Sequence, residues 1–140
     1  DLSVAEVDEN SIREYTAAMA AGWGMDPGPL EPLHRAVLND PARRGRLLLA
    51  RWGGVPAATA SLFLFPRSAF FIGAVVLPPF RGRGLYRALC AARLRLAADL
   101  GVPLCTTHAM AHTSAPILRR LGFVEVCRFS KFMSPTQSAL

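Results

Sequence analysis

One junction near the middle of the sequence constrains the fold more than any other feature. The apolar segment 69–76 has the β-branched and aromatic residues of a buried strand. Two prolines follow it, and then a short loop, residues 81–84, that contains two glycines. After the loop, apolar residues recur at helical steps of three and four, namely Leu85, Leu89, Ala92, Leu96 and Leu100. A strand that passes through a glycine loop directly into a helix indicates an α/β chain.

The segments on either side of this junction predict further elements. Alternating or apolar runs predict strands at residues 2–7, 46–52, 55–65, 102–107 and 123–132. Helical signals predict a helix that Asp8 or Asn10 caps and Gly22-Trp23-Gly24 ends, a helix over residues 31–38, and a short helix from about Thr113 to Gly122. Segment 69–76 is the most apolar strand and is expected at the centre of the sheet, which residues 123–132 would close.

The composition fits a folded chain. A length of 140 residues fits one domain better than two, and we expect a single domain over residues 1–140. The content of 51% hydrophobic and 19% charged residues excludes an intrinsically disordered chain. The longest near-apolar stretch, residues 69–80, holds a glycine and two prolines and is too short to span a bilayer. No membrane partner is therefore expected.

The start of the sequence bears on location. It begins at Asp1 without a methionine, which suggests a trimmed chain or a piece of a longer one. No basic and apolar leader precedes the first strand, so we expect a cytoplasmic protein. The three cysteines, Cys90, Cys105 and Cys127, are widely spaced and have apolar neighbours. Their pattern argues against a disulfide framework or a zinc site, and it predicts buried free thiols and no metal.

The net charge of +6 invites a nucleic-acid-binding interpretation. The positive charge is almost all arginine, however, with Lys131 as the single lysine, and no tract of five basic residues occurs. We therefore expect no specific nucleic-acid partner. The exception is local, because Arg81, Arg83 and Arg87 lie together and would attract a polyanionic ligand.

The glycine loop itself has the features of a diphosphate-binding site. At a helix N-terminus the backbone N–H groups point outward and the peptide dipoles add about half a positive charge. Gly82 and Gly84 allow the backbone to approach an anion closely, and Arg81 and Arg83 add formal charge. A glycine pair alone is also typical of a tight strand-to-helix turn, so the loop does not identify the ligand.

Two motifs together resemble the GNAT superfamily of N-acetyltransferases. Residues 76–84 read Val-x-Pro-x-x-Arg-Gly-x-Gly, which is similar to the coenzyme A segment of that family. Residues 114–123 end in Leu-Gly-Phe, like the short helix that follows it in the family. The resemblance implies an α/β (α+β) GNAT fold, with a central, mixed, mostly antiparallel twisted sheet of about six to seven strands flanked by about four helices. It also implies acetyl-CoA as co-substrate.

The resemblance further implies roles for individual residues. The strand before the loop would diverge from its neighbour and pair with the pantetheine arm through Ala74, Val75 and Val76. The loop that would hold the pyrophosphate consists of Arg81, Gly82, Arg83, Gly84, Leu85 and Tyr86. A backbone N–H at about Val76 would polarise the acetyl carbonyl. Two positions depart from the family pattern: Tyr86 replaces a Gly or Ala, and Leu118 replaces the tyrosine that protonates the leaving thiolate in many members.

An amine acceptor must lose a proton, so a base or a water chain is needed. His108 is the first candidate, because it follows strand 102–107 and a histidine has a suitable pKa. A surface or packing role is its alternative. His112 and His34 are weaker candidates for the base. Trp23, between two glycines, is the best candidate among the aromatic residues to line an acceptor pocket.

The resemblance implies an acetyl-CoA-dependent N-acetyltransferase that acts on a primary amine of a small molecule or peptide. Direct transfer in a ternary complex is expected, because no cysteine has the setting of a nucleophile. The alternative is a non-catalytic acyl-CoA-binding module of a larger protein, which Leu118 favours. Neither the acceptor nor the oligomeric state is fixed by the sequence, although a homodimer through a sheet edge or the last strands is compatible with the fold.

Overall fold

The elements follow one another along the chain in the predicted order, apart from the last strand. The computed structural model describes residues 1–134, which fall into two compact units, Asp1–His108 and a second unit that begins at Ala109. The elements are β1 (Leu2–Glu6), α1 (Ile12–Trp23), α2 (Leu30–Leu38), β2 (Gly45–Trp52), β3 (Val55–Phe65), β4 (Ser68–Val76), the 3-10 turn η1 (Pro78–Phe80), α3 (Leu85–Asp99), β5 (Cys105–Thr107) and α4 (Ser114–Arg120).

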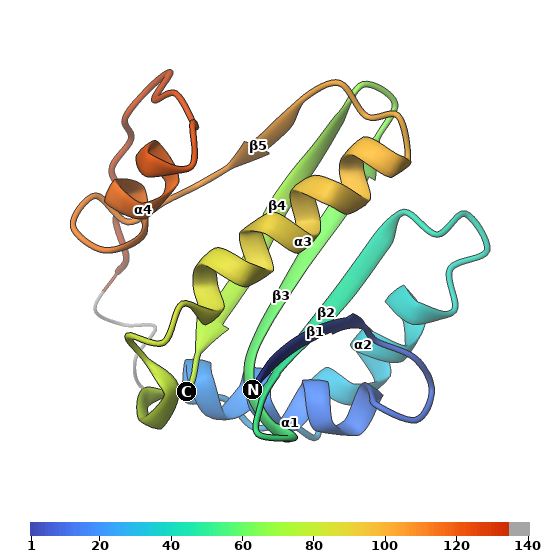
Figure 1. Ribbon diagram of the computed structural model, residues 1–140. Helices are drawn as coiled ribbons and strands as arrows, with labels where there is room; N and C mark the ends of the chain where they lie inside the picture. The colour runs from blue at the N-terminus through green and yellow to red at the C-terminus, as the bar shows by residue number, and fades with distance from the viewer. Residues whose placement is uncertain (135–140) are drawn as a thin grey trace. The chain divides into compact units, whose positions relative to one another are not determined.

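All strands belong to one sheet in the order β1-β2-β3-β4-β5 (Figure 1). Neighbours are antiparallel except β4 and β5, which are parallel, so the sheet is mixed and mostly antiparallel, as the family resemblance implies. Within residues 1–134 it has five strands, not six to seven. The central strand is β3, whereas the sequence analysis expected segment 69–76, now β4, at the centre.

The missing strand is the predicted one at residues 123–132. This segment has no strand structure, and the exposed fractions of Val124, Val126 and Phe132 are 82%, 90% and 91%. Glu125 instead forms ion pairs with Arg119 and Arg128. The apolar pattern shows that a segment can form a strand, but a strand also needs an edge to pair with, and the pattern does not supply one.

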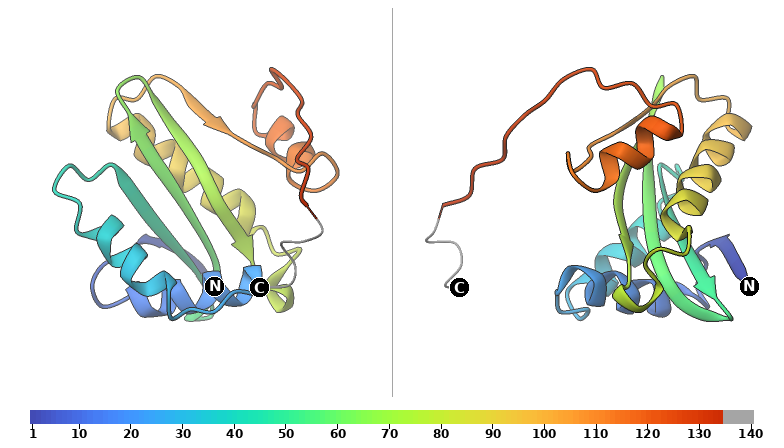
Figure 2. Two further views of the ribbon diagram at one scale, coloured as in Figure 1. Left: turned by 180° about the vertical axis from the view of Figure 1, so that it is seen from behind. Right: turned by 60° about the vertical axis from the view of Figure 1, so that its left-hand side comes forward.

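Helices cover both faces of the sheet in the first unit. Figures 1 and 2 show α3 on one face and α1 with α2 on the other. On the α1 face the buried apolar core contains Val7, Ile12, Tyr15, Leu47 and Leu49. Ile12 and Tyr15 are three residues apart on α1, which explains why this side of the helix is buried.

Two predictions from the composition, on the cysteines and on membrane spans, can be compared with the structure. Cys90 is buried, but Cys105 is half-buried and Cys127 is exposed, so the prediction of three buried thiols is wrong for Cys127. All three are free. In the part of the chain that the structure describes, no helix has both the length and the apolar character needed to cross a membrane.

Candidate functional site

The glycine loop joins the end of β4 to the start of α3 through a short turn. After η1, Arg81 is extended, and Gly82 and Gly84 have φ angles of +74° and +81°. Both angles lie in the left-handed region, which side chains other than glycine adopt only with strain. A Cβ on either glycine would have nothing within 4 Å. Glycine is therefore required here by the backbone conformation and not by a lack of space for a side chain.

Helix α3 begins directly at this loop. Gly84 is its N-cap, and the first bond along the helix runs from Ala88 N–H to the Gly84 carbonyl at 2.9 Å. Leu85 is 1% exposed and anchors the start of the helix in the core. The first-turn amides therefore point toward the loop, and the dipole of a 15-residue helix adds positive potential there.

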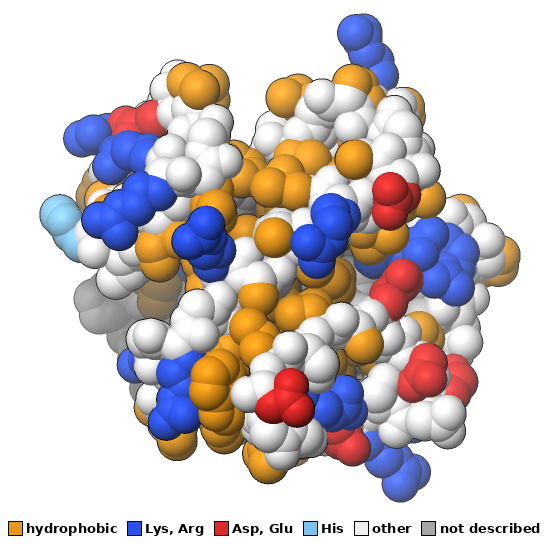
Figure 3. Space-filling model, in the orientation of Figure 1, with side chains coloured by type: hydrophobic (Ala, Val, Ile, Leu, Met, Phe, Trp, Pro, Cys, Tyr) orange, Lys and Arg blue, Asp and Glu red, His pale blue; other side chains and the backbone are white. Residues whose placement is uncertain are grey.

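The two loop arginines are exposed and are held by neighbouring groups. Arg81 Nε donates to the Val76 carbonyl at 3.3 Å. The Arg83 guanidinium lies over the ring of Trp52, 5.1 Å from its centroid. Arg87, one turn into the helix, is exposed. On the face that Figure 3 shows, arginines and lysines form separate groups with apolar side chains between them, and no continuous basic tract is seen.

Strand β4 parts from β5 before it reaches the loop. The parallel pairing covers three residue pairs and ends where Phe71 meets Thr107. The Thr107 hydroxyl donates to the Phe71 carbonyl at 3.0 Å at this last pair. Strand β4 continues to Val76, so residues 72–76 have no β5 partner within residues 1–134. The predicted pantetheine-binding residues, Ala74–Val76, lie on this diverging segment.

His108 lies where the two strands part. It directly follows the last residue of β5, its side chain is exposed, and its ring packs edge-on against Phe70 with centroids 5.2 Å apart. This is the end of β5 at which the sequence analysis expected it. His112 is exposed and belongs to the second unit.

His34, a weaker candidate for the base, is buried. Only 5% of it is exposed, its Nδ1 lies 2.8 Å from the hydroxyl of Thr16, and its ring meets Tyr15 edge-on at 5.0 Å. Burial lowers the pKa of His34 below 6.5. These contacts make it part of the packing between α1 and α2.

The end of α1 lies against the diverging end of β4 (Figure 1). A Cβ on Gly22 would be 2.6 and 2.7 Å from the two γ-carbons of Val75, so the helix can approach this closely only through a glycine. The next residue, Trp23, is 53% exposed despite its size. The last residue of α1 therefore leaves a large aromatic side chain exposed.

Two residues that sequence reasoning missed lie between α3 and the sheet, Arg93 on α3 and Ser61 on β3. Ser61 is 6% exposed and Arg93 is 2% exposed, and Arg93 Nη1 donates to the Ser61 carbonyl at 3.2 Å. A signal for Arg93 existed: it is four residues after Leu89 and therefore lies on the apolar face of the helix. No local pattern marks Ser61.

In the second unit, Leu118 is 4% exposed on α4, and its carbonyl accepts from Phe123 N–H at 3.0 Å. A leucine cannot donate a proton, whatever its surroundings. Among the described residues no group of three or more His, Cys, Asp or Glu side chains is arranged to hold a metal ion.

Comparisons with known proteins identify the family. A family model described as Acetyltransferase (GNAT) family matches residues 9–123. The comparison with curated proteins gave no significant match.

Solved structures share the fold at low sequence identity. AAC(6')-Iy in complex with the bisubstrate analog CoA-S-monomethyl-acetylneamine has a TM-score of 0.81 at 18% identity, over 96% of this chain and 98% of that one. AAC(6')-Ih, an aminoglycoside antibiotic 6'-N-acetyltransferase from Acinetobacter baumannii, gives 0.77 at 18%, over 96% and 98%. A predicted acetyltransferase with acetyl-CoA from Clostridium acetobutylicum gives 0.74 at 14%, over 95% and 96%.

The family model covers most of the chain, from α1 through the glycine loop to the Leu-Gly-Phe motif, and the fold agrees with it. This chain therefore belongs to the GNAT family and is an N-acetyltransferase.

Proposed function

We propose that this protein binds acetyl-CoA between the glycine loop and the diverging end of β4, and transfers the acetyl group directly to a primary amine of a small molecule or peptide. One observation carries the proposal. Within residues 1–134 the only parallel pair of the sheet, β4 with β5, separates at Phe71, and β4 then leads through two left-handed glycines into the N-terminus of α3. An anion site and an open strand edge thus follow each other along the chain.

The pyrophosphate would bind at the loop. Six residues would contribute backbone amides or charge: Arg81, Gly82, Arg83, Gly84, Leu85 and Tyr86. The pantetheine arm would then run along Ala74, Val75 and Val76, whose strand edge has no β5 partner within residues 1–134. An extended ligand can pair with such an edge in the way that a further strand would.

The chemistry would be attack of the amine nitrogen on the thioester carbonyl carbon. A backbone N–H at about Val76 would stabilise the charge that develops on the carbonyl oxygen. The C–S bond then breaks and the thiolate of CoA leaves. His108 would take the proton from the amine, and its exposed position where the strands part supports this role. Leu118 cannot protonate the thiolate, so solvent would supply that proton.

Titration of the protein with acetyl-CoA in a calorimeter tests the proposal. We expect saturable binding, which the Gly84→Glu variant weakens by at least about 100-fold, because it places bulk and negative charge at the phosphates. Gly101→Glu is the matched control: Gly101 follows the other end of α3, has a φ of +71°, and also has nothing within 4 Å of a Cβ. It should bind like the wild type.

Two results would overturn the proposal. Absence of wild-type binding up to about 500 μM acetyl-CoA would exclude acetyl-CoA as the co-substrate. Equal binding by the Gly84→Glu and Gly101→Glu variants would show that the assigned loop is wrong.

A second candidate function is a non-catalytic acyl-CoA-binding module of a larger protein. The leucine at position 118, buried on α4, favours it, because it removes the expected proton donor. A panel of small amines and peptide N-termini, with release of CoA thiol as the readout, separates the two functions. Turnover of any acceptor supports the enzyme, and tight acetyl-CoA binding without turnover supports the module.

Further predictions concern the protein's surroundings. We propose a cytoplasmic location, which the three free cysteines suit, and no specific nucleic-acid or membrane partner. A homodimer would form through an edge strand, β1 or β5, or through the segment after α4. Sedimentation of the purified protein measures this directly.

A further inference from the structure

A buried guanidinium without an acidic partner lies between α3 and the sheet. Arg93 is 2% exposed, and no carboxylate within residues 1–134 forms an ion pair with it. Nη1 donates to the Ser61 carbonyl at 3.2 Å, Nε to the Leu89 carbonyl at 3.3 Å, and Nη2 lies 3.4 Å from Cys90 Sγ. The guanidinium also lies over the ring of Phe71, 4.5 Å from its centroid. Burying a charge without a counter-ion costs stability, so stability alone does not explain an arginine here.

The Ser61 carbonyl that Arg93 holds belongs to a bulge between β3 and β4. Thr59 is paired with Val75. The next pair, Ser61 with Ile72, is two residues farther along β3 but three residues away along β4, so β4 contains one extra residue. Gly73, inside this step, has a φ of +68°, and the Ser61 hydroxyl donates to the Ile72 carbonyl at 3.0 Å.

The bulge turns the end of β4 over. Before it, Phe71 faces α3, because the Arg93 guanidinium lies over its ring. After it, Val75 faces α1, because its γ-carbons lie against Gly22. Residues four apart in an unbroken strand point to the same face, so the extra residue has reversed the direction of everything that follows.

The same serine is also held from the other face of the sheet. Tyr15 of α1 is 1% exposed, and its pKa is raised to about 12 by burial, against the opposing effects of a hydrogen bond with Ser61 and the charge of Arg93. The neutral phenol and the guanidinium thus contact Ser61 from opposite sides. Two helices meet the sheet at the residue where its register changes.

We propose that Arg93 is a positioning residue for acetyl transfer: by holding the Ser61 carbonyl it maintains the bulge that turns Ala74–Val76 toward the acyl group. The inference rests on the proposed function. Arg93 is eight residues after Leu85, about 12 Å along the helix. Helix α3 would therefore bind the pyrophosphate at its N-terminus. Through Arg93 it would also fix the conformation of the β4 segment that contacts the thioester.

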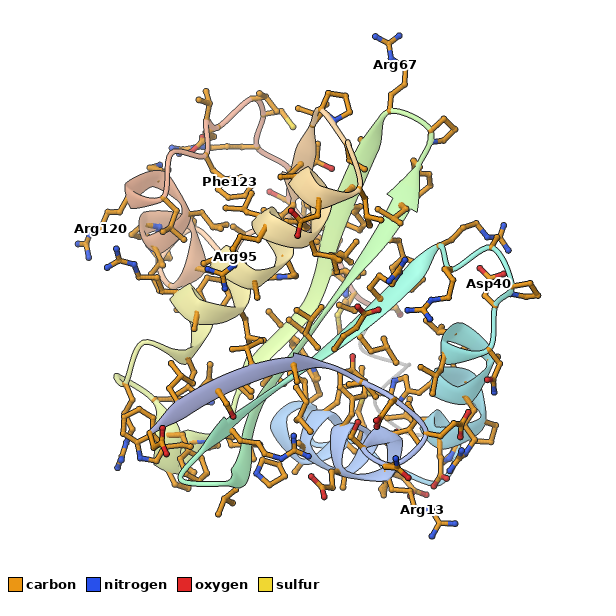
Figure 4. All side chains as sticks on the ribbon, turned by 45° about the vertical axis from the view of Figure 1, so that its right-hand side comes forward. Arg13, Asp40, Arg67, Arg95, Arg120 and Phe123 are labelled. Carbon is orange, nitrogen blue, oxygen red and sulfur yellow. The ribbon has the colours of Figure 1, made fainter. Side chains whose placement is uncertain are left out.

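The first test uses the protein without ligand. Arg93→Met removes the charge and the donors and keeps most of the length. Arg95→Met is the matched control, because Arg95 is exposed on the same helix (Figure 4). We expect amide hydrogen exchange in residues 72–76 to become at least about tenfold faster in Arg93→Met and to stay unchanged in Arg95→Met. Equal exchange in the two variants would overturn the proposal.

The second test follows backbone amide NMR signals during an acetyl-CoA titration. In the wild type, Gly82 and Gly84 report on the loop and Val76 reports on the thioester. In Arg93→Met we expect the Val76 response to fall by at least half while both glycines still respond. A purely structural arginine would lower the unfolding temperature and leave the Val76 response intact, and that result would overturn the proposal.

The two tests separate this inference from the function on which it rests. If Gly82 and Gly84 do not respond in the wild type, the proposed function fails, and the exchange experiment still decides the role of Arg93 in the bulge. If Arg93→Met does not fold, Arg93→Lys serves instead, because it keeps the charge but cannot donate in the planar pattern of a guanidinium. Wild-type exchange and a wild-type Val76 response in that variant would overturn the proposal.

Discussion

At the scale of single residues, the close contact between Gly22 and Val75 fixes how near α1 lies to β4. We predict that Gly22→Ala destabilises the protein by about 1–3 kcal/mol, because its Cβ would overlap both γ-carbons of Val75. Adding Val75→Ala should restore part of the loss by removing those carbons. Thermal unfolding measures both effects. Gly28→Ala is the control, since its Cβ would meet only Asp26, at 3.4 Å, and it should change little.

A second prediction at the residue scale concerns how His34 makes the stability of the protein depend on pH. Its folded-state pKa is lowered by burial, so the unfolded chain binds the proton more readily than the folded one. The stability from His34 is then complete above its unfolded pKa of about 6.5 and is lost as the pH falls through the folded value. Urea unfolding at about pH 7.5 and pH 5.5 should show this loss. His34→Gln, which can still meet Thr16, should reduce the slope, and an unchanged slope would contradict the assignment.

At the scale of elements, the loop and the first turn of α3 act as one positively charged unit. We predict that CoA binds at least about 100-fold more tightly than pantetheine, which lacks the diphosphate. Affinity for CoA should also fall as salt is added, whereas affinity for pantetheine should not, because the loop arginines are exposed and therefore screened. Calorimetry with both ligands at low and high salt measures this. Equal affinities would mean that the loop contributes nothing.

The elements also show what a sequence can predict. The strand-loop-helix junction was predictable because its signals are local: apolar runs, two glycines and a helical period within residues 69–100. The bulge was not predictable, because it depends on the pairing of Ser61 on β3 with Ile72 on β4, which no local pattern marks. The strand expected at 123–132 failed for the same reason, because pairing depends on a partner that the pattern does not contain.

The residues of the candidate site also fall into those that the sequence could predict and those that it could not. The loop residues and Ala74–Val76 could be assigned by motif, and the structure places them at consecutive parts of one junction. The burial of His34 was missed because it depends on the packing of α2 against α1. Arg93 was missed because an arginine on an apolar helix face is unusual, and its acceptor lies on a strand 32 residues away in sequence.

At the scale of the whole molecule, the prediction of a single domain can be tested with two independent probes. Both tryptophans, Trp23 and Trp52, belong to the unit Asp1–His108, and the exposed Cys127 belongs to the second unit. If residues 1–140 form one domain, tryptophan fluorescence and a label on Cys127 should give the same urea midpoint. Two separate midpoints would show two domains that unfold independently.

The bulge divides β4 into two parts that pack against different layers of the protein. Phe71 belongs to the core beneath α3, whereas Val75, four residues later, faces α1. Under the proposed function, substitutions in the first half should therefore be selected for folding, and those in the second half for how the protein binds acetyl-CoA. Under the proposed function, a lineage of such enzymes could change how it holds the acyl group by altering a few residues at the far end of β4 and the tip of α1, without rebuilding the core that supports them.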